Sequence, residues 1–473
     1  MKRSLARLGS ALNMSMDKYI PDCFLFAVGL TFIIFIMGMT IAGKGLFQMI
    51  EYWYNGFWGF LAFSMQMVLI IVTGYTLAVT PIGNKIFTWL ATIPKSSLPA
   101  VVFIGVVVSV LSWLHWGLGI VAGAILAPKM GRNIPRINYK MLVASAYVGW
   151  CSGAYGLTVT ETLIVNTPGH FMQKQIGLIP ISQTSFHIEI LVPVILCTFV
   201  IVPALWWLFH PEEDEIPPLD AAVVAAFEQE IAEEKAKMEG ELTCKPDTAD
   251  SSTGLATGIN VAAKKEKTIA SRIEDSRIIC YLTSALALSY VVYWFATKGF
   301  DLNLNIFNFA MLFIGFALHG TPRRFYTAFA EGTKLSWGVV LQFPFYAGIQ
   351  GMMGASGLVA IISGWFVAIS TPLTFPLWTF VSASIVNFFI PSAGGILMVQ
   401  GPIMMNAAQV LGVPYADTIR AFTAGENIAN IIQPFFAIPL LALARLEMKD
   451  IMGYCIIAWI VTSIAFMVSI WVF

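Results

Sequence analysis

Apolar stretches of about 20 residues recur along the chain, separated by short polar or glycine-rich segments. A helix rises about 1.5 Å per residue, so a stretch of this length spans the roughly 30 Å hydrocarbon core of a bilayer. We therefore expect an all-α polytopic membrane protein with about nine full spans. The predicted spans lie at about residues 22–42, 56–79, 139–165, 187–209, 278–297, 303–319, 336–354, 415–444 and 451–473.

Two further apolar stretches, at residues 98–128 and 375–408, are too long and too broken for one straight helix each. The second contains the segment NFFIPSAGG (387–395), in which a proline and two glycines interrupt the helix. Backbone that leaves the helix inside a membrane must be buried in protein or line a wet cavity, as in the substrate sites of secondary transporters. The pattern predicts two re-entrant helical hairpins, the first of which turns near residues 112–119.

The same order of segments occurs in both halves of the chain. Each half has a span that opens with Trp-Gly and carries a glutamine, then a shorter amphipathic piece, a broken segment, an interrupted span and a final span. One hairpin would enter from the cytoplasm and the other from outside, so the order predicts an inverted repeat. The expected parts are a first membrane repeat at residues 1–210, an acidic cytoplasmic linker at 211–277 and a second membrane repeat at 278–473.

Composition supports the membrane class, since 58% of the 473 residues are hydrophobic, 11% are charged and the mean hydropathy is +0.76. A net charge of zero argues against a nucleic-acid partner. Fifteen of the nineteen Lys and Arg residues outside the linker fall on one predicted side, which the positive-inside rule makes cytoplasmic, together with the N-terminus. The six cysteines show no CxxC pair or zinc spacing, so we expect neither a metal site nor a cofactor.

The hairpin turns and the interrupted spans supply candidate groups for binding a substrate. Half-helix N-termini and free amides attract a carboxylate, which suits a small organic anion. Alternatively, the small residues serve helix packing and the histidine makes a structural hydrogen bond. The candidate substrate-binding residues are Ser112, His115, Gly117, Ser152, Thr158, Asn387, Ser392, Gly394, Gly395, Asn427, Asn430 and Gln433.

Glu161 and Glu426 are acidic residues inside apolar spans rather than in loops or near span ends. A carboxylate at the centre of a bilayer costs on the order of 2.5–3.5 kcal/mol, and burial favours its protonated form. Glu426 is therefore the first candidate for carrying a proton and Glu161 the second. The alternative is that each glutamate bonds to broken backbone and holds the fold. Arg420 is expected to anchor the outer interface.

Several long blocks resemble one family over nearly the whole chain apart from the linker. These blocks are Asp22 with Phe26, GFWGFLAFSMQMVLIIVTGYTLA (56–78), LQFPFYAGIQGMM (341–353), NFFIPSAGG with VQGPIMMNAAQVLG (387–412) and KDIMGYCI (449–456). They are similar to the bacterial short-chain fatty acid uptake permeases, within the ion transporter superfamily. The resemblance implies inward transport of monocarboxylates such as acetoacetate and butyrate across the inner membrane, coupled to an ion, by an elevator-type movement. It also implies a homodimer, since elevator-type relatives are often dimers.

The chain departs from the pattern of that family in the second hairpin and in the second interrupted span. In the second hairpin Ala393 replaces one of three glycines, and Ile396 and Leu397 follow where His-Trp is usual. In the second interrupted span Asn427 stands in place of a glutamine. A more apolar hairpin favours a longer or different acyl chain, so the chain length of the substrate stays open.

The predicted function is secondary active symport of a short-chain monocarboxylate with H⁺. The carboxylate would rest against the two hairpin turns, and the acyl tail would meet Phe388 and Trp116. A Na⁺-coupled carboxylate transporter is the nearest alternative, with Ser392, Thr158 and Asn430 as sodium ligands. A passive anion channel is an alternative from another class. An intramembrane enzyme is disfavoured, because no HExxH, GxSxG or paired-aspartate pattern lies in a span.

Overall fold

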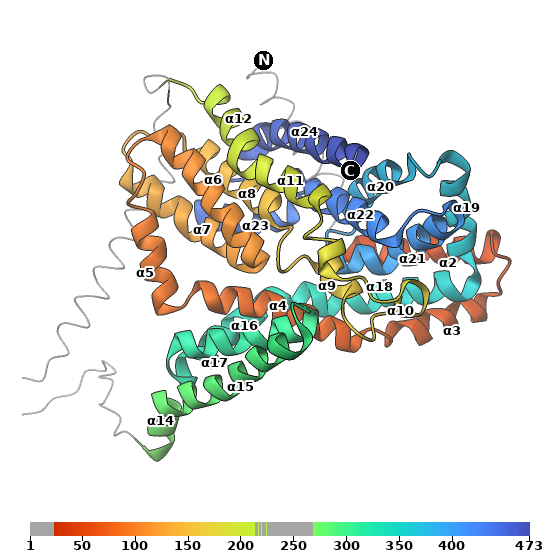
Figure 1. Cartoon of the computed structure of the whole chain (residues 1–473), viewed down its shortest axis with the longest axis horizontal. Coiled ribbons are helices and arrows are strands. Elements are labelled where there is room, and N and C mark those ends of the chain that lie inside the picture. Colours follow the sequence, from red (N-terminus) through yellow and green to blue (C-terminus); the bar gives the residue numbers. More distant parts are fainter. Residues whose placement is uncertain (1–22, 213–215, 217–218, 220–223, 225–267) are drawn as a thin grey trace, which may run out of the picture.

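The computed structural model describes residues 23–212, 216, 219, 224 and 268–473. The basic N-terminal residues and most of the predicted linker lie outside these ranges. The described residues form helices and connecting loops without any strand, so the prediction of an all-α protein is confirmed (Figure 1).

The first half contains eleven described α-helices. They are α2 (Cys23–Thr40), α3 (Leu46–Phe57), α4 (Leu61–Ala78), α5 (Pro81–Leu90), α6 (Ser97–Leu114), α7 (Trp116–Asn133), α8 (Tyr139–Gly153), α9 (Thr160–Val165), α10 (Gln173–Ile176), α11 (Ile188–Leu196) and α12 (Val202–Phe209). A π-helical turn (Cys197–Ile201) joins α11 to α12, and there the Val202 N–H donates to the Cys197 carbonyl. Pro203 follows and has no N–H to donate, which accounts for the irregular turn at this point.

The second half contains eleven more α-helices in its described part. They are α14 (Ile269–Glu274), α15 (Arg277–Lys298), α16 (Leu304–His319), α17 (Pro322–Thr333), α18 (Trp337–Ser356), α19 (Leu358–Ile369), α20 (Phe375–Asn387), α21 (Ala393–Leu411), α22 (Tyr415–Ala429), α23 (Ile438–Ala444) and α24 (Met448–Val472). The chain bends by 82° between Ser356 and Leu358, where Gly357 has a left-handed φ of +87°.

The described helices bear out a multi-pass membrane protein but not the number of spans. Five of them are long and apolar enough to cross a bilayer, and a sixth is added if the pair bent at Gly357 counts as one span. Three apolar helices are shorter than a straight crossing requires, and glycine and proline divide the two interrupted spans. The first arm of the first hairpin, α6, is itself one of the five, so a re-entrant position for it stays a prediction.

Both long broken segments fold back on themselves as helical hairpins. In the first, α6 and α7 are separated by His115, and Gly119 packs against Ser112. In the second, a break at residues 388–392 separates α20 from α21, and Gln400 Nε2 donates to Ser382 Oγ at 2.6 Å. Each hairpin has an interrupted helix beside its first arm, because α6 packs on α8 and α20 packs on α22.

The two halves pack on each other reciprocally. Helix α3 lies against α18, and its counterpart α17 lies against α4. Helix α7 contacts α23, and α21 contacts α9 in the same way. At the α3–α18 contact a Cβ on Gly56 would lie 2.6 Å from the Ala347 carbonyl oxygen and 2.9 Å from Gly351 Cα, so the two backbones touch.

The apolar core has two parts that meet at α22. One part surrounds α6–α8, α12, α23 and α24 and includes Ile428, and the other surrounds α3, α4, α16, α18 and α21 and includes Phe422. Figure 1 shows α6, α7 and α8 toward one end of the molecule and α19, α20 and α21 toward the other. Glu426 lies just past the point on α22 where one part gives way to the other, between Ala424 and Ile428 of the first part.

Candidate functional site

The first hairpin turns at His115, which is 2% exposed. Its Nδ1 accepts a hydrogen bond from the Gly117 N–H at 3.2 Å, so the imidazole caps the N-terminus of α7. Because Nδ1 accepts, the ring proton is on Nε2, which lies 3.4 Å from Thr73 Oγ1. This arrangement corresponds to the structural alternative for His115.

The first turn is also fastened to the break between α8 and α9. The Trp116 N–H donates to Thr158 Oγ1 at 2.9 Å, and the Leu157 N–H donates to the Trp113 carbonyl at 2.8 Å. Gly156 permits this closeness, since a Cβ there would lie 2.0 Å from the Trp113 oxygen. Thr158 thus meets the turn that the sequence predicted it to face.

Little of the first turn is free for an anion. The amides of Trp116 and Gly117 are already paired with Thr158 and His115. The Ser112 hydroxyl donates to the Val108 carbonyl of its own helix at 2.7 Å. A carboxylate bound to these amides would have to displace a side chain that now caps them.

The second hairpin turn packs against aromatic side chains of α4 and α18. Ser392 Oγ accepts a hydrogen bond from the Gly395 N–H at 3.3 Å and caps α21. A Cβ on Gly394 would lie 2.8 Å from the Phe63 ring, and one on Gly395 would lie 2.8 Å from the Tyr346 ring. The glycines at 394 and 395 therefore let aromatic rings approach the N-terminus of α21.

The second hairpin is tied to α22 by paired amides. Asn387, the last residue of α20, donates from Nδ2 to the Glu426 carbonyl at 3.1 Å and to Asn430 Oδ1 at 2.8 Å. Asn430 in turn donates from Nδ2 to Glu426 Oε1 at 3.4 Å. Three predicted site residues thus form one hydrogen-bonded group around the break after α22.

The two predicted ion-coupling residues meet in the interior. The Glu161 side chain, in the first turn of α9, lies beside the Glu426 side chain of α22, where the two helices pack on each other. Glu161 is 1% exposed and Glu426 is 2% exposed. Two carboxyl groups that close together are stable only if one of them carries a proton. The pair comes from the two halves of the chain.

Asn427 and Gln433 support broken backbone. Asn427 Nδ2 donates to the Ala154 carbonyl at 2.7 Å, which joins the two interrupted helices at their breaks. Gln433 Oε1 accepts from the Phe435 N–H at 2.8 Å. Both amides thus bond main-chain groups that the interruptions free from helical pairing.

Two tyrosines at this site were not predicted from the sequence. Tyr147 Oη lies 2.6 Å from the Asn430 carbonyl oxygen and 2.8 Å from that of Gln433, so its hydroxyl satisfies the break after α22. Tyr155 Oη donates to the Ala424 carbonyl at 3.2 Å. The proximity of Tyr155 to glycine-broken helix was the only available signal, because a tyrosine in an apolar span is typical of a packed core.

Several buried polar atoms near the breaks have no hydrogen-bond partner. They are Glu161 Oε1, Asn387 Oδ1, Ser152 Oγ and Thr423 Oγ1. Leaving a polar group buried and unpaired costs about 1–3 kcal/mol, so each of these atoms could accept or donate one further hydrogen bond at a gain.

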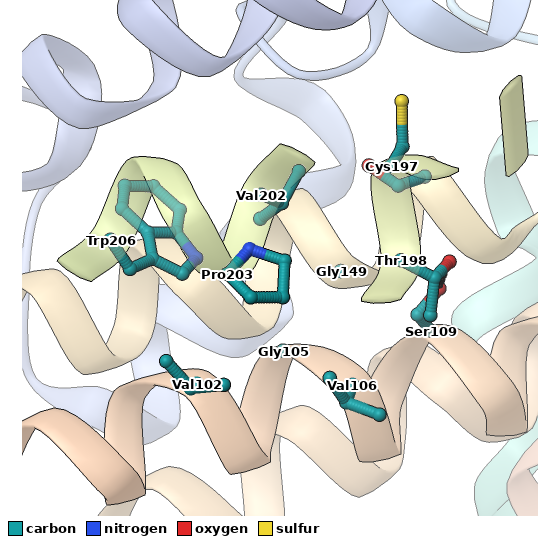
Figure 2. A pocket seen from close by; sticks show the side chains of 11 residues that line it. Val102, Gly105, Val106, Ser109, Gly149, Cys197, Thr198, Val202, Pro203 and Trp206 are labelled. Atoms are coloured by element: carbon teal, nitrogen blue, oxygen red, sulfur yellow. Dashed lines mark hydrogen bonds between the residues drawn. The ribbon is translucent and has the colours of Figure 1, made fainter. Parts of the chain in front are cut away.

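Figure 2 shows a small cavity between α6, α8 and the α11–α12 segment. It has a volume of about 10 Å³, close to that of one water molecule. Ser109 Oγ and Thr198 Oγ1 lie 2.7 Å apart on its wall, and Ser152 also lines it. Of the predicted site residues, Ser152 lines this cavity and the others do not.

Arg420 is buried in the protein and bonded to three partners. It is 5% exposed, and it donates from Nε to Glu189 Oε2 at 2.6 Å, from Nη2 to Asp417 Oδ1 at 3.0 Å and from Nη1 to the Gln183 carbonyl at 2.8 Å. The expected role of Arg420 at the outer interface stays a prediction. Its pairing with Glu189 was not predicted, because the two residues are distant in sequence and meet only through the tertiary fold.

Within the described ranges, no three or more His, Cys, Asp or Glu side chains are grouped so as to hold a metal ion. A buried group of amides and carboxyls at the meeting of two broken hairpins and two broken helices is an arrangement suited to small-molecule or ion transport. The fold and the site thus define a polytopic helical membrane protein of the transporter class.

Sequence comparison gives the family. Residues 4–473 match the family described as short chain fatty acid transporter, and the chain belongs to that family. It is 33% identical over 477 residues to a proposed short-chain fatty acid transporter of Haemophilus influenzae, with 99% of each chain covered. It is 32% identical over 472 residues to one of Escherichia coli, with 99% of this chain and 100% of that chain covered.

A solved structure shares the fold. The YdaH transporter of Alcanivorax borkumensis, described as having an unusual topology, aligns with a TM-score of 0.57 at 14% identity. The alignment covers 96% of this chain and 98% of that one. At this identity the likeness concerns the architecture alone.

Proposed function

We propose that this protein is a secondary active transporter that imports short-chain monocarboxylates, such as acetoacetate and butyrate, together with H⁺. Membership of the short chain fatty acid transporter family is the observation that carries the substrate class. The two broken hairpins that pack beside two broken helices supply a place for such a substrate inside the membrane.

The inverted repeat and the elevator movement belong to this proposal. The reciprocal contacts of α3 with α18 and of α17 with α4 are what a pseudo-two-fold relation between the halves would produce. Nine spans, re-entrant hairpins, a cytoplasmic N-terminus and linker in the bacterial inner membrane, and a homodimer stay predictions. Labelling of engineered surface cysteines from each side, and light scattering of the purified protein, would test topology and oligomeric state.

For the substrate, the second turn is the better candidate for the carboxylate. The amides of the first turn are paired with Thr158 and His115, whereas the second turn has a serine cap and two buried glycines. The aromatic rings of Phe63 and Phe343, stacked with centroids 5.7 Å apart, adjoin Gly394 and offer an apolar surface for an acyl tail.

For the coupling ion, the buried, adjacent carboxyl groups of Glu161 and Glu426 favour H⁺. The sodium alternative would use Ser392, Thr158 and Asn430. In this structure Thr158 Oγ1 accepts from Trp116, and Asn430 Oδ1 accepts from Asn387, so two of these oxygens are already bonded. A passive anion channel is the alternative from another class, and it would not accumulate substrate against a gradient.

The experiment is uptake of labelled butyrate and acetoacetate into proteoliposomes under an inward proton gradient, an inward sodium gradient or neither. We expect accumulation under the proton gradient that a protonophore abolishes. Dependence on sodium alone would replace H⁺ by Na⁺ in the proposal. Equilibration without accumulation would favour the channel, and absence of uptake under every condition would contradict the substrate class.

A further inference from the structure

The contact between Glu161 and Glu426 joins two segments that are far apart in the sequence. Glu161 begins the short helix α9 directly after the first break, and Glu426 lies one turn before the second break. Both side chains are buried where α9 packs on α22, and two carboxyl groups that close together are stable only if one of them carries a proton. Two ionised carboxylates in contact away from water would repel each other strongly.

Within the described part of the chain, no lysine or arginine acts on the pair that could replace this proton. The titratable groups that face it are Tyr155, Cys151 and, near Cys151, Cys455. Arg420, on the same helix as Glu426, is engaged with Glu189 and Asp417. Without a cation nearby, the negative charge of the two carboxyl groups can be reduced only by binding a proton.

The pair is connected to the second hairpin by a short path. Asn430 Nδ2 donates to Glu426 Oε1, and Asn387 Nδ2 donates both to Asn430 Oδ1 and to the Glu426 carbonyl. Asn387 is the residue at which α20 ends, directly before the break. A change in the charge of the Glu426 carboxyl group would alter the acceptor that holds Asn430, and through it the end of α20.

Unpaired oxygens lie at both ends of this path. Glu161 Oε1 and Asn387 Oδ1 are buried without a partner, so each can accept one more hydrogen bond. A structural pair would be expected to have its acceptors filled, because an unfilled buried acceptor is costly.

We propose that Glu161 and Glu426 form one proton-binding unit that holds a single proton between two carboxyl groups, and that Asn430 and Asn387 connect this unit to the second hairpin. The inference rests on the proposed symport and assigns its coupling site. One proton from water binds a carboxylate oxygen of the unit and later leaves to water on the other side, so no other co-reactant is needed.

The test compares two kinds of transport in proteoliposomes made with the full chain and its Glu161→Gln and Glu426→Gln variants. Glutamine keeps the size and one acceptor of the protonated carboxyl group but cannot release a proton. We expect proton-driven accumulation of butyrate to fall to passive equilibration in each variant, whereas exchange of internal for external butyrate continues. Exchange needs no net release of a proton, so loss of proton coupling alone would leave it intact. If the two glutamates were only structural, their replacement would impair accumulation and exchange together.

The matched control is Glu189→Gln, which alters another buried carboxyl group but leaves the unit intact. We expect it to lower thermal stability and to leave the ratio of accumulation to exchange unchanged. Accumulation that persists in both Glu161→Gln and Glu426→Gln would overturn the inference while leaving the proposed symport in place. Failure of the unaltered protein to transport butyrate would instead contradict the proposed function.

A measurement on the unaltered protein keeps the inference testable if either variant fails to fold. Infrared difference spectra between acidic and alkaline samples report the C=O stretch of protonated carboxyl groups. We expect butyrate binding at constant pH to perturb such a band and to change the proton content of the protein. If the C=O band changed neither with butyrate nor with pH, the result would contradict a proton-binding unit.

Discussion

The two hairpins have the same architecture and different chemistry at their turns. At the first turn, His115 and Thr158 pair the amides at the start of α7, and the turn is fastened to the adjacent broken helix. At the second, Ser392 caps α21, aromatic rings approach the glycines, and Asn387 leads to the two buried carboxyl groups. Both hairpins are thus held to the adjacent interrupted helix, but only the contacts of the second lead to a buried carboxyl group, so under the proposed mechanism the second would respond to charge.

The largest expected effect comes from Gly156→Ala, which tests how tightly the first turn is fastened. The new Cβ would meet the Trp113 carbonyl oxygen at 2.0 Å, and main chain cannot move aside as a side chain can. We expect the free energy of unfolding to fall by more than about 3 kcal/mol. Thermal unfolding of the purified protein measures this. Gly354→Ala, with nothing within 4 Å of its Cβ, is the control and should not lose stability.

Thr158→Val should have a smaller effect, because it removes one acceptor and keeps the shape of the side chain. The partly buried Trp116 N–H would then lose its partner, at a cost of about 1 kcal/mol. Thr158→Ser retains the hydroxyl and should recover most of that stability. Equal stability of the valine and serine variants would show that the hydrogen bond does not fasten the first turn.

Ser392→Ala sharpens the comparison from the other side. It removes the cap of the Gly395 N–H, and loss of such a cap costs about 1 kcal/mol. Ser392 bonds only within its own turn, and Asn387 still holds the hairpin to α22, so we expect transport of butyrate to change more than stability does. Unfolding temperature and the KM for butyrate, measured on the same preparation, separate the two effects. A KM equal to that of the unaltered protein would remove Ser392 from the proposed site.

The smallest expected effect concerns His170, in the loop whose Phe171 packs on Phe63 with ring centroids 6.3 Å apart. Burial lowers the pKa of His170 below its usual value of 6.5, although a hydrogen bond to the Gly177 carbonyl opposes this. A depressed pKa means that protonation favours the unfolded chain, so stability present above about pH 6.5 declines as the pH falls. His170→Gln should flatten the dependence of unfolding temperature on pH between about 7 and 5. A dependence as steep as that of the unaltered protein would assign the titration elsewhere.

The sequence predicted where helices are interrupted better than it predicted which distant residues contact each other. Glycine, proline and polar residues inside apolar stretches indicated both hairpins and both interrupted helices, because those residues act locally on the backbone. Glu161 and Glu426 were singled out for the cost of burying a carboxylate. Their contact with each other could not be predicted, since residues 161 and 426 meet only through the tertiary fold.

Other features were missed for the same physical reason. Helices α3 and α17 are too polar on one face to resemble spans, yet each packs along a span of the opposite half. The pairing of Arg420 with Glu189 and the support that Tyr147 gives to Asn430 also join distant segments. Composition and periodicity report how a residue suits its own helix, and not which helix lies beside it.

The glycine contact between α3 and α18 has a consequence for how the two halves are held together. Lipid tails are as apolar as leucine, so the hydrophobic effect contributes little free energy to the association of helices in a bilayer. At Gly56 and Gly351 the backbones touch, and attraction there depends on the fit of the two surfaces. Shape complementarity thus holds the halves together at this interface more than hydrophobicity does. Adding one methyl group there would weaken the association more than changing the lipid would.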